Sequence, residues 1–431
     1  MALALWAGQK EDVKRGISIM DDFLLRFYPD VYQHKKNTKG DNYCMFFLGG
    51  TAIGTAAQNL SMIIAGRALL GCGIGFANQA VPVYLSEVAP ASMRGLLNMF
   101  FTLYISVGAL SGNMVNFLAN KVHPWGWRIS LGVAGVPAIL LTIGSLVIVE
   151  TPSSLIERGK LEQAKEVLHK IREDADVSNE FDELVESSRR AQGSSSWEAY
   201  KQLFCERRHR GELVIACLLP FFQQASGNDA ILFYGAFLFK LAGFADDASL
   251  YSAIILGVAG LLTMSASAFF VDKFGRRYII LMGCVLMVSS LVVVGSIFGA
   301  TLKGDVRKLP RPEGITEVVM VCVFVMGFAG SIGPLAWVIP TEILSQNVRS
   351  VGQSVTVFIN MLFKFIIAQT FLSTLCSFKF GIFFFFAGWG LVIAAFTVLF
   401  LPETKHVPLS KMETLWQSHW FWKHIVHSPS P

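Results

Sequence analysis

Charged residues are scarce in this chain, and the shortage decides its broad class. Only 16% of the 431 residues are Asp, Glu, Lys or Arg, whereas soluble domains average about 25%. The formal net charge of +5 is too small, for a chain of this length, to indicate a basic surface for nucleic acid. We therefore expect neither a soluble domain nor a nucleic-acid partner.

Sequence motifs for metal binding and covalent catalysis are also lacking. The seven Cys residues, at positions 44, 72, 205, 217, 284, 322 and 376, form no CxxC pair and no Cys/His metal pattern. Most lie in or beside apolar stretches, where a small hydrophobic residue is the simpler interpretation. The sequence also contains no P-loop and no candidate nucleophile. It therefore predicts no metal site, no cofactor and no enzymatic activity.

Long apolar runs are what the chain has in abundance. Nine blocks have the length that a helix needs to cross a hydrocarbon core of ~30 Å. They are 62–85, 96–118, 129–149, 213–239, 250–271, 278–300, 318–339, 351–372 and 380–401. A tenth run, 45–59, would reach only ~22 Å as a helix. The pattern predicts an all-α membrane protein with about ten transmembrane helices.

A polar insert at 151–210 divides these blocks into an early and a late set. Of its 60 residues 23 are charged, and the stretch SSLIERGKLEQAKEVLHKIRE has helical periodicity. The expected division is a polar N-terminal segment (1–44), a first helix bundle (45–150), a cytosolic helical linker (151–210), a second bundle of six helices (211–403) and a cytosolic tail (404–431).

The early and late sets carry matching signatures at nearly one spacing. SEVAPASMRG and TEILSQNVRS each place a Glu seven residues before an Arg, and VETP matches PETK. The matching residues are Glu87 with Arg94, Glu342 with Arg349, and Glu150 with Glu403. The offsets between the sets are 255 and 253 residues. A duplicated half is therefore indicated, as in transporters built from parallel repeats.

The repeat also reveals a gap in the early half. The late landmark DKFGRR at 272–277 should have an early partner near residue 17, and none is there. We therefore expect the chain to lack about two helices of its early half. Ten helices would put both ends on one side, and the basic 272–277 loop and the charged 151–210 insert predict that this side is cytosolic.

Several long strings resemble one family of membrane carriers. They are GRALLGCGIGFANQAVPVYLSEVAPASMRG (66–95), GWRISLG (126–132), ETPSSLIERGK (150–160), PFFQQASGN (220–228), VDKFGRR (271–277), GPLAWVIPTEILSQNVRSVGQS (333–354) and LPETK (401–405). Over about residues 16–410 the chain resembles the sugar porter family of the major facilitator superfamily, and within it the plant monosaccharide/proton symporters. The resemblance implies two helix bundles with twelve helices. Here the first helix would survive only within 1–44, beside an extracellular lid, and the second would be missing.

The resemblance places a sugar site among polar residues of the apolar blocks. A sugar needs side chains that both donate and accept hydrogen bonds, and a flat apolar wall. Polar groups in membrane helices usually face a cavity, although they can also bond between helices without any ligand. The expected sugar-binding residues are Gln223, Gln224, Asn228, Asp229, Trp337, Asn360 and Thr102.

Some of these positions depart from the family pattern. Asp229 stands where the family usually has a sugar-contacting Asn, and an ionised Asp only accepts hydrogen bonds. Thr102 replaces a family Gln and reaches less far. Lys364 lies one helical turn from Asn360 on the same face. From there an ion pair between Lys364 and Asp229 is a further possibility, in place of a sugar contact.

Proton coupling in the family uses an Asp on the first helix opposite an Arg on the fourth. Arg67 in GRALLG matches that Arg, but the position of the Asp holds Val13, Lys14 and Arg15. An intramembrane charge needs a partner, and the expected one is missing. The proton is the family's co-substrate, but we expect this chain not to couple sugar to protons.

Charged residues at the predicted cytosolic helix ends indicate a gate. Ion pairs there can hold two bundles in one state and break in the other. The simpler alternative is that they are ordinary charges at helix ends, but the matched repeat spacing favours the gate. The gate residues are Glu87, Arg94, Glu150, Asp272, Gly275, Arg276, Arg277, Glu342, Arg349 and Glu403.

Cys44 and Cys376 match a family pair that is bridged on the extracellular side, where oxidation is possible. If 45–59 spans from the cytosol, Cys44 lies inside and cannot meet Cys376. If 45–59 does not span, the bridge becomes possible. We favour the unbridged alternative, and both stay open.

The leading interpretation is a carrier of a hexose in the plasma membrane, with the sugar and the lipid bilayer as its partners. It would work by alternating access of its two bundles. Two alternatives remain: a sugar sensor that does not transport, and a truncated product without function.

Overall fold

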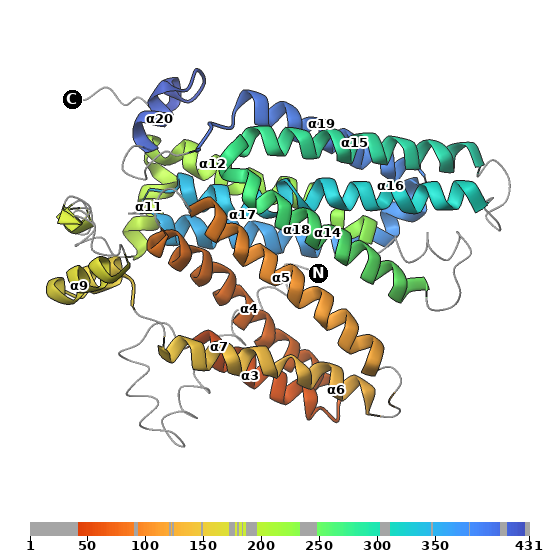
Figure 1. Ribbon diagram of the computed structural model, residues 1–431, viewed down its shortest axis with the longest axis horizontal. Coiled ribbons are helices and arrows are strands. Elements are labelled where there is room, and N and C mark those ends of the chain that lie inside the picture. Colours follow the sequence, from red (N-terminus) through yellow and green to blue (C-terminus); the bar gives the residue numbers. More distant parts are fainter. Residues whose placement is uncertain are drawn as a thin grey trace. The chain divides into compact units, whose positions relative to one another are not determined.

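The structure is a computed structural model in which every regular element of the described residues is a helix (Figure 1). The described residues are 42–89, 94–119, 122, 125–147, 150–171, 177–178, 181–182, 184–186, 196–232, 248–301, 311–345, 348–378, 380–405 and 412–426.

Helices occupy each of the apolar blocks. They are α3 (Asn42–Thr55), α4 (Leu60–Val88), α5 (Arg94–Ala119), α6 (Gly126–Val133) with α7 (Gly135–Val147), α12 (Arg210–Ala225), α14 (Ala248–Phe274), α15 (Arg276–Thr301), α16 (Arg311–Ala329) with α17 (Ile332–Ile343), α18 (Arg349–Phe378) and α19 (Gly381–Leu399). Within the described part of the chain, 7 helical spans are long and apolar enough to cross a membrane. The prediction of an all-α membrane protein is confirmed.

The chain divides into two compact units. One comprises 1–77 and 127–148, and the other comprises 78–126 and 149–431. Packing therefore groups α5, which precedes the polar insert, with the helices that follow it. The bundle boundaries expected from the sequence remain a prediction.

In the first unit, α3 is held by close contact between backbones. A Cβ on Gly50 would overlap the backbone at Gly66 and Leu70, and a Cβ on Gly66 would overlap the backbone at Gly50 and Gly54. Small residues that let two helices touch in this way drive helix association in membranes, where apolar burial contributes little. With 14 residues, α3 reaches only ~21 Å. Its close contact with α4, and not its length, therefore holds it in place.

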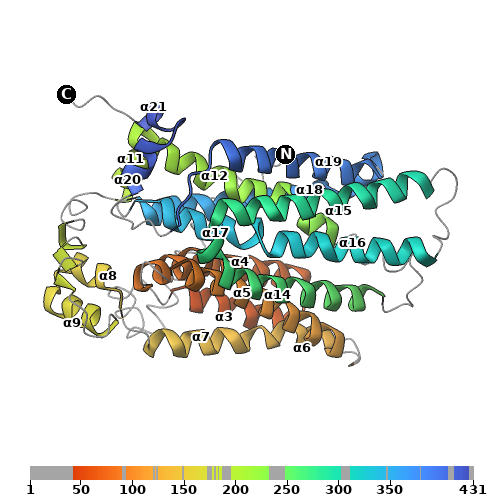
Figure 2. The same ribbon diagram turned by 45° about the horizontal axis from the view of Figure 1, so that its top comes forward.

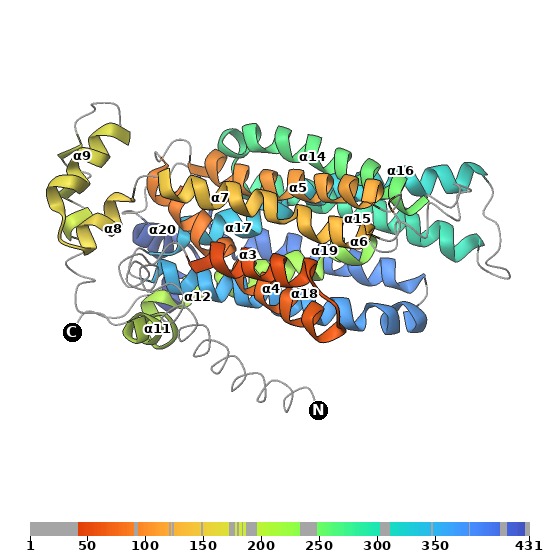
Figure 3. The ribbon, with the colours of Figure 1, turned by 90° about the horizontal axis from the view of Figure 1, so that it is seen from below.

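In the second unit, the helices pack in pairs along their lengths. α15 lies beside α16 and α19 (Figure 1), α12 beside α18 (Figure 2), and α5 beside α14 (Figure 3). The core combines aliphatic and aromatic side chains, and Phe298 of α15 and Phe383 of α19 are stacked at 5.5 Å between ring centroids. These pairs bring residues from distant parts of the sequence to the two sites described below.

The polar insert contains helices, of which the first two cover the stretch SSLIERGKLEQAKEVLHKIRE that has helical periodicity. They are α8 (Pro152–Glu157), α9 (Leu161–Ile171), α11 (Ser196–Cys205) and the short 3-10 helix η1 (Arg207–His209). Thr151 caps α8 by accepting a hydrogen bond from the Ser154 backbone NH, and Pro152 occupies the first turn. α8 and α9 pack together around Leu155, Ile156 and Ala164 (Figure 2).

The C-terminal tail is docked against the rest of the second unit by tryptophans. It forms α20 (Met412–Ser418) and α21 (Lys423–Val426). Trp416 and Trp422 are 2% and 3% exposed. The Trp422 indole donates to the Phe400 carbonyl at 2.7 Å. A Cβ at Gly211, at the start of α12, would overlap the Trp416 ring, so the glycine lets the tail approach closely. From the sequence, a cytosolic tail at 404–431 is expected, without any helix in it.

We expect Trp416→Ala to lower the free energy of unfolding by about 3–5 kcal/mol, because it empties a buried site of a large ring. Trp420→Ala is the matched control, since that ring is 57% exposed, and it should cost only about 1 kcal/mol for its hydrogen bond to Leu399. Denaturant unfolding of the purified protein in detergent measures both. Similar losses in the two variants would contradict a docked tail.

Candidate functional site

The first site lies at the C-terminal end of α12, where the helix is interrupted at Ser226 and Gly227 and then resumes. Gly227 follows Gln223 and Gln224 and has a φ of +81°, which a residue with a Cβ rarely adopts. A Cβ there would also overlap the ring of Phe386. Helical structure resumes at Asn228. Two consecutive glutamines are therefore presented at the end of one helical segment and an Asn-Asp pair at the start of the next.

Three amide side chains from α12 and α18 bond to one another, and we call Gln223, Gln224 and Asn360 the amide trio. The Gln223 amide donates to the backbone carbonyl of Gly333, and the Asn360 amide donates to the Gln223 side-chain oxygen. Gln224 donates in turn to the Asn360 side-chain oxygen at 3.3 Å. All three side chains are buried. The structure brings these three predicted residues together.

Trp337 supplies an aromatic ring on α17, one helical turn from Gly333, whose carbonyl the amide trio contacts. It lies four residues after Gly333 on α17, and Gly333 accepts the bond from Gln223. Its ring packs edge to face on Phe101 of α5, at 6.4 Å between centroids. A flat ring beside groups that can donate and accept hydrogen bonds is the combination that a sugar ring requires.

Asn228 and Asp229 lie beyond the helix break. The side-chain oxygen of Asn228 is buried and accepts no hydrogen bond from any described residue. One carboxylate oxygen of Asp229 lies 3.3 Å from the Lys364 ammonium. That oxygen makes no hydrogen bond of good geometry with the described residues, so the contact is an ion pair. The ion pair anticipated from the sequence is present.

Thr102 and Arg67 are two further residues expected at the sugar and proton sites. The Thr102 hydroxyl donates to the Met99 carbonyl of its own helix at 2.8 Å. Arg67 is exposed on α4, and no acid among the described residues forms an ion pair with it. Val13, Lys14 and Arg15, which occupy the position of the family's acid, lie outside the described residues. The roles of Thr102 and Arg67 remain predictions.

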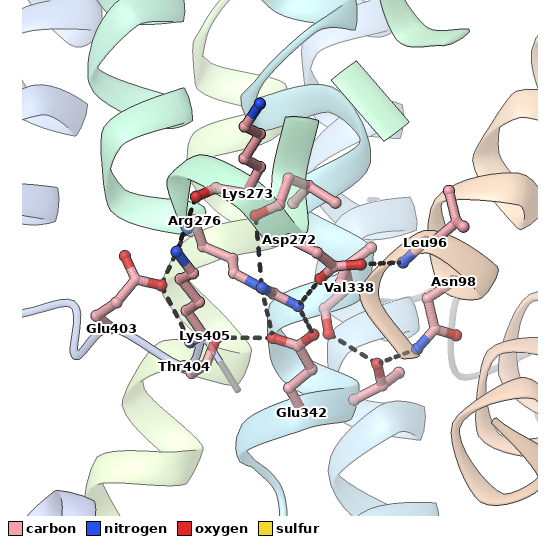
Figure 4. A network of polar contacts seen from close by, with 12 residues as sticks. Leu96, Asn98, Asp272, Lys273, Arg276, Val338, Glu342, Glu403, Thr404 and Lys405 are labelled. Carbon is pink, nitrogen blue, oxygen red and sulfur yellow. Dashed lines mark hydrogen bonds and ion pairs between the residues drawn. The ribbon is translucent and has the colours of Figure 1, made fainter. Parts of the chain in front are cut away.

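The second site is a network of charges around Arg276, at the start of α15 (Figure 4). The Arg276 guanidinium donates to both carboxylate oxygens of Glu342, at 2.6 and 3.1 Å. The same guanidinium lies 2.9 Å from an Asp272 oxygen. The Arg276 and Glu342 side chains are 4% and 5% exposed. A bidentate contact of this kind is the strongest geometry available to an Arg–carboxylate pair.

Glu403 caps the helix that carries this arginine. Its carboxylate accepts hydrogen bonds from the backbone NH groups of Arg276 and Arg277, at 3.0 and 3.1 Å. An anion at this place also interacts favourably with the helix dipole. Gly275 has a φ of +91°, and a Cβ on it would lie 2.8 Å from the Glu403 carboxylate. We call Asp272, Arg276, Glu342 and Glu403 the arginine network (Figure 4).

The arginine network reaches α5 as well. Asp272 accepts a hydrogen bond from the backbone NH of Leu96, at the start of α5, at 3.2 Å. A Cβ on Gly95 would overlap both Asp272 and Arg276, so only glycine allows this approach. Asn98 donates to Thr341 of α17 at 3.3 Å. The network therefore ties a helix from before the polar insert to α14, α15 and α17 (Figure 4).

The other predicted gate residues lie outside this network. Glu150 pairs with Arg158 at 2.9 Å, and both side chains are exposed. Arg349 donates to the Leu344 carbonyl, and Arg277 donates to that of Val398. Glu87 lies in the last turn of α4. The side chain of Arg94 lies outside the description, as do those of Cys44 and Cys376, so the predicted disulfide stays untested.

One buried polar cluster was missed by the sequence analysis. Glu212, at the start of α12, accepts hydrogen bonds from the Ser345 backbone and hydroxyl at 3.2 and 3.1 Å. His209 lies 3.3 Å from the same carboxylate oxygen. The cluster ties the start of α12 to the turn after α17. A lone acid immediately before the apolar run 213–239 was the available signal.

Comparison with known proteins adds the family context. The family model described as sugar (and other) transporters matches residues 30–416. Sugar transport protein MST4 of Oryza sativa subsp. japonica is 45% identical over 465 residues, covering 98% of this chain and 90% of that protein. Sugar transport protein 13 of Arabidopsis thaliana is 44% identical, covering 98% and 88%. The alignment of 465 residues exceeds the 431 of this chain, so the rice protein has positions without a counterpart here.

Solved structures of a sugar transporter have a similar fold. The proton:xylose symporter XylE of the major facilitator superfamily, bound to 6-bromo-6-deoxy-D-glucose, superimposes with a TM-score of 0.75 at 25% identity, covering 89% of this chain and 85% of that one. The inward open conformation of XylE from E. coli gives a TM-score of 0.60 at 24% identity, covering 89% and 84%.

We expect Glu342→Gln to lower the free energy of unfolding by about 3–5 kcal/mol, because it leaves the buried Arg276 without its main partner. Glu150→Gln removes an exposed pair instead and should cost less than about 1 kcal/mol. Thermal unfolding of the two purified variants in the same detergent measures the difference. Equal effects would show that the arginine network is no stronger than a surface ion pair.

Proposed function

The chain belongs to the family of sugar (and other) transporters, and from that premise we propose that it carries a monosaccharide, specifically a hexose, across the plasma membrane. It has the major facilitator fold of two helix bundles, with about ten of the usual twelve transmembrane helices. Like its relatives, which are sugar transport proteins, it is not an enzyme. Transport by alternating access of the two bundles involves no covalent step.

The observation that carries the proposal is the amide trio beside Trp337. Side-chain amides that hydrogen-bond across three helices, next to an indole ring and a helix break, match the polar and apolar faces of a hexose. Discontinuous helices are common at substrate sites near the centre of transporters. The unpartnered Asn228 oxygen offers one more acceptor beside them.

The arginine network is the proposed cytosolic gate. It consists of Asp272, Arg276 and Glu342 at the ends of α14, α15 and α17, together with Glu403 after α19, and it ties α5 to these helices. Buried ion pairs are worth little on balance when intact, but breaking one by separation of its partners is costly unless water reaches both. A network with these properties favours two discrete states, closed and water-filled, over intermediate ones.

We propose that transport in this chain is not driven by protons through the family's Asp–Arg pair. XylE is a proton symporter by its description. Here Arg67 is the retained half of that pair, and Val13, Lys14 and Arg15 stand at the position of the acid. A basic residue cannot take up the proton that an acid would carry at neutral pH.

Asn360→Ala should raise the KM for glucose at least about tenfold, the equivalent of ~1.4 kcal/mol, because it removes the amide that both glutamines contact. Gln417→Ala, an exposed amide on α20, is the matched control and should leave the KM unchanged. Uptake of labelled glucose into yeast without its own hexose carriers measures both, at equal surface amounts. An unchanged KM in Asn360→Ala would refute this site.

In the same cells, a protonophore should leave the initial rate of glucose uptake by the parent chain unchanged within about twofold. A collapse of uptake would mean that another acid has replaced the missing Asp. Absence of uptake by protein that has reached the surface would refute the transport proposal and favour a sensor or a product without function.

A further inference from the structure

Lys364 lies on the same stripe of the apolar helix α18 as two buried amides, although its own side chain is exposed. Gln353, Asn360, Lys364 and Phe371 share one stripe of α18, since their separations of seven and eleven residues are close to whole numbers of turns. Gln353 and Asn360 are buried, and Phe371 packs on the hydrophobic core. The Lys364 ammonium is directed toward Asp229, in the segment that continues α12.

Three contacts join α12 and its continuation to α18 in the same order along both helices. Thr356 donates to the Ala216 carbonyl at 3.2 Å, Gln224 donates to Asn360, and Lys364 pairs with Asp229 at 3.3 Å. The pair of Asp229 and Lys364, which we call the charged pair, thus lies one turn beyond the amide trio in one polar seam. A ligand held at the trio is within reach of the pair.

The charged pair is more exposed than the trio. Gln223, Gln224 and Asn360 are 8%, 9% and 3% exposed and bond mainly to one another. The Asp229 and Lys364 side chains are 27% and 55% exposed. An ionised carboxylate accepts about four hydrogen bonds and an ammonium donates three, so their contact leaves free capacity on both groups.

We propose that the charged pair determines specificity by reading two neighbouring hydroxyl groups of the sugar. The inference rests on the proposed sugar transport. The Asp229 carboxylate accepts a hydrogen bond from one hydroxyl, and the Lys364 ammonium donates to the oxygen of the next. Each group compensates the charge of the other, so a neutral monosaccharide is favoured over an acidic or an amino sugar.

The chemistry explains how Asp229 can replace a neutral amide. A hydrogen bond to a charged group is roughly twice as strong as one between neutral groups. A site that is built to bind a hydroxyl strongly rejects the analogue that lacks it, because buried polar groups are left without partners. Lys364 compensates the charge of the Asp229 carboxylate in its apolar surroundings. Together the two residues offer the sugar two charged contacts in place of one neutral amide contact.

The test is competition against labelled glucose for binding to the purified full-length chain. The competitors are glucose analogues that lack one hydroxyl at a time. The parent should reject the analogues lacking either of two adjacent hydroxyls by at least about 100-fold. Lys364→Gln and Asp229→Asn should each weaken glucose binding at least about tenfold while barely changing the binding of the analogue that lacks the hydroxyl contacted by the replaced residue, so that the selectivity at that position falls by the same factor. The double variant should lose less than the product of the two single losses.

Lys423→Gln, on the tail helix, is the control for removal of a lysine and should change nothing.

A purely structural ion pair would behave differently, since its loss would weaken every competitor by the same factor. That result, or a parent that binds all the analogues alike, would overturn the proposal while leaving sugar transport intact. Failure of the parent chain to bind any sugar would overturn both.

Discussion

Hydrocarbon supplies no hydrogen bonds, so each polar group placed within it needs a partner inside the protein. This constraint accounts for most of what is specific in the second unit. The amides of Gln223, Gln224 and Asn360 bond to one another and to a backbone carbonyl. Arg276 is surrounded by carboxylates. Asp229 has Lys364. Exceptions among the described residues include the Asn228 oxygen at the proposed sugar site and, elsewhere, both carboxylate oxygens of Glu317 on α16.

Glycine makes some of these contacts possible, because a Cβ at the same position would overlap the charged side chains. Gly95 and Gly275 allow Asp272, Arg276 and Glu403 to reach the starts of α5 and α15. Gly227 breaks the helix just after the glutamines. Both sites therefore depend on glycines, which contribute no functional side chain.

The apolar blocks, the helical insert and the membership of the amide trio could be predicted from the sequence, because they follow from length, periodicity and long matching strings. Lys364 was recognised by its one-turn spacing from Asn360. What could not be predicted are the pairings that depend on tertiary contact. Glu212 meets Ser345 across 133 residues, and Trp416 docks because Gly211 leaves room for it. The repeat spacing makes Glu150 and Glu403 equivalent positions of the two halves. It does not reveal that Glu150 pairs locally with Arg158.

The central claim is that the amides beside Trp337 form a sugar site and not merely a set of bonds between helices. Equilibrium binding of labelled glucose to the purified chain, compared with Trp337→Leu, tests it most directly. The account predicts saturable binding that unlabelled glucose displaces, with a loss of affinity of at least about tenfold in the variant, since the ring supplies the stacking surface. Equal binding by both proteins, or no saturable binding by the parent, would contradict it.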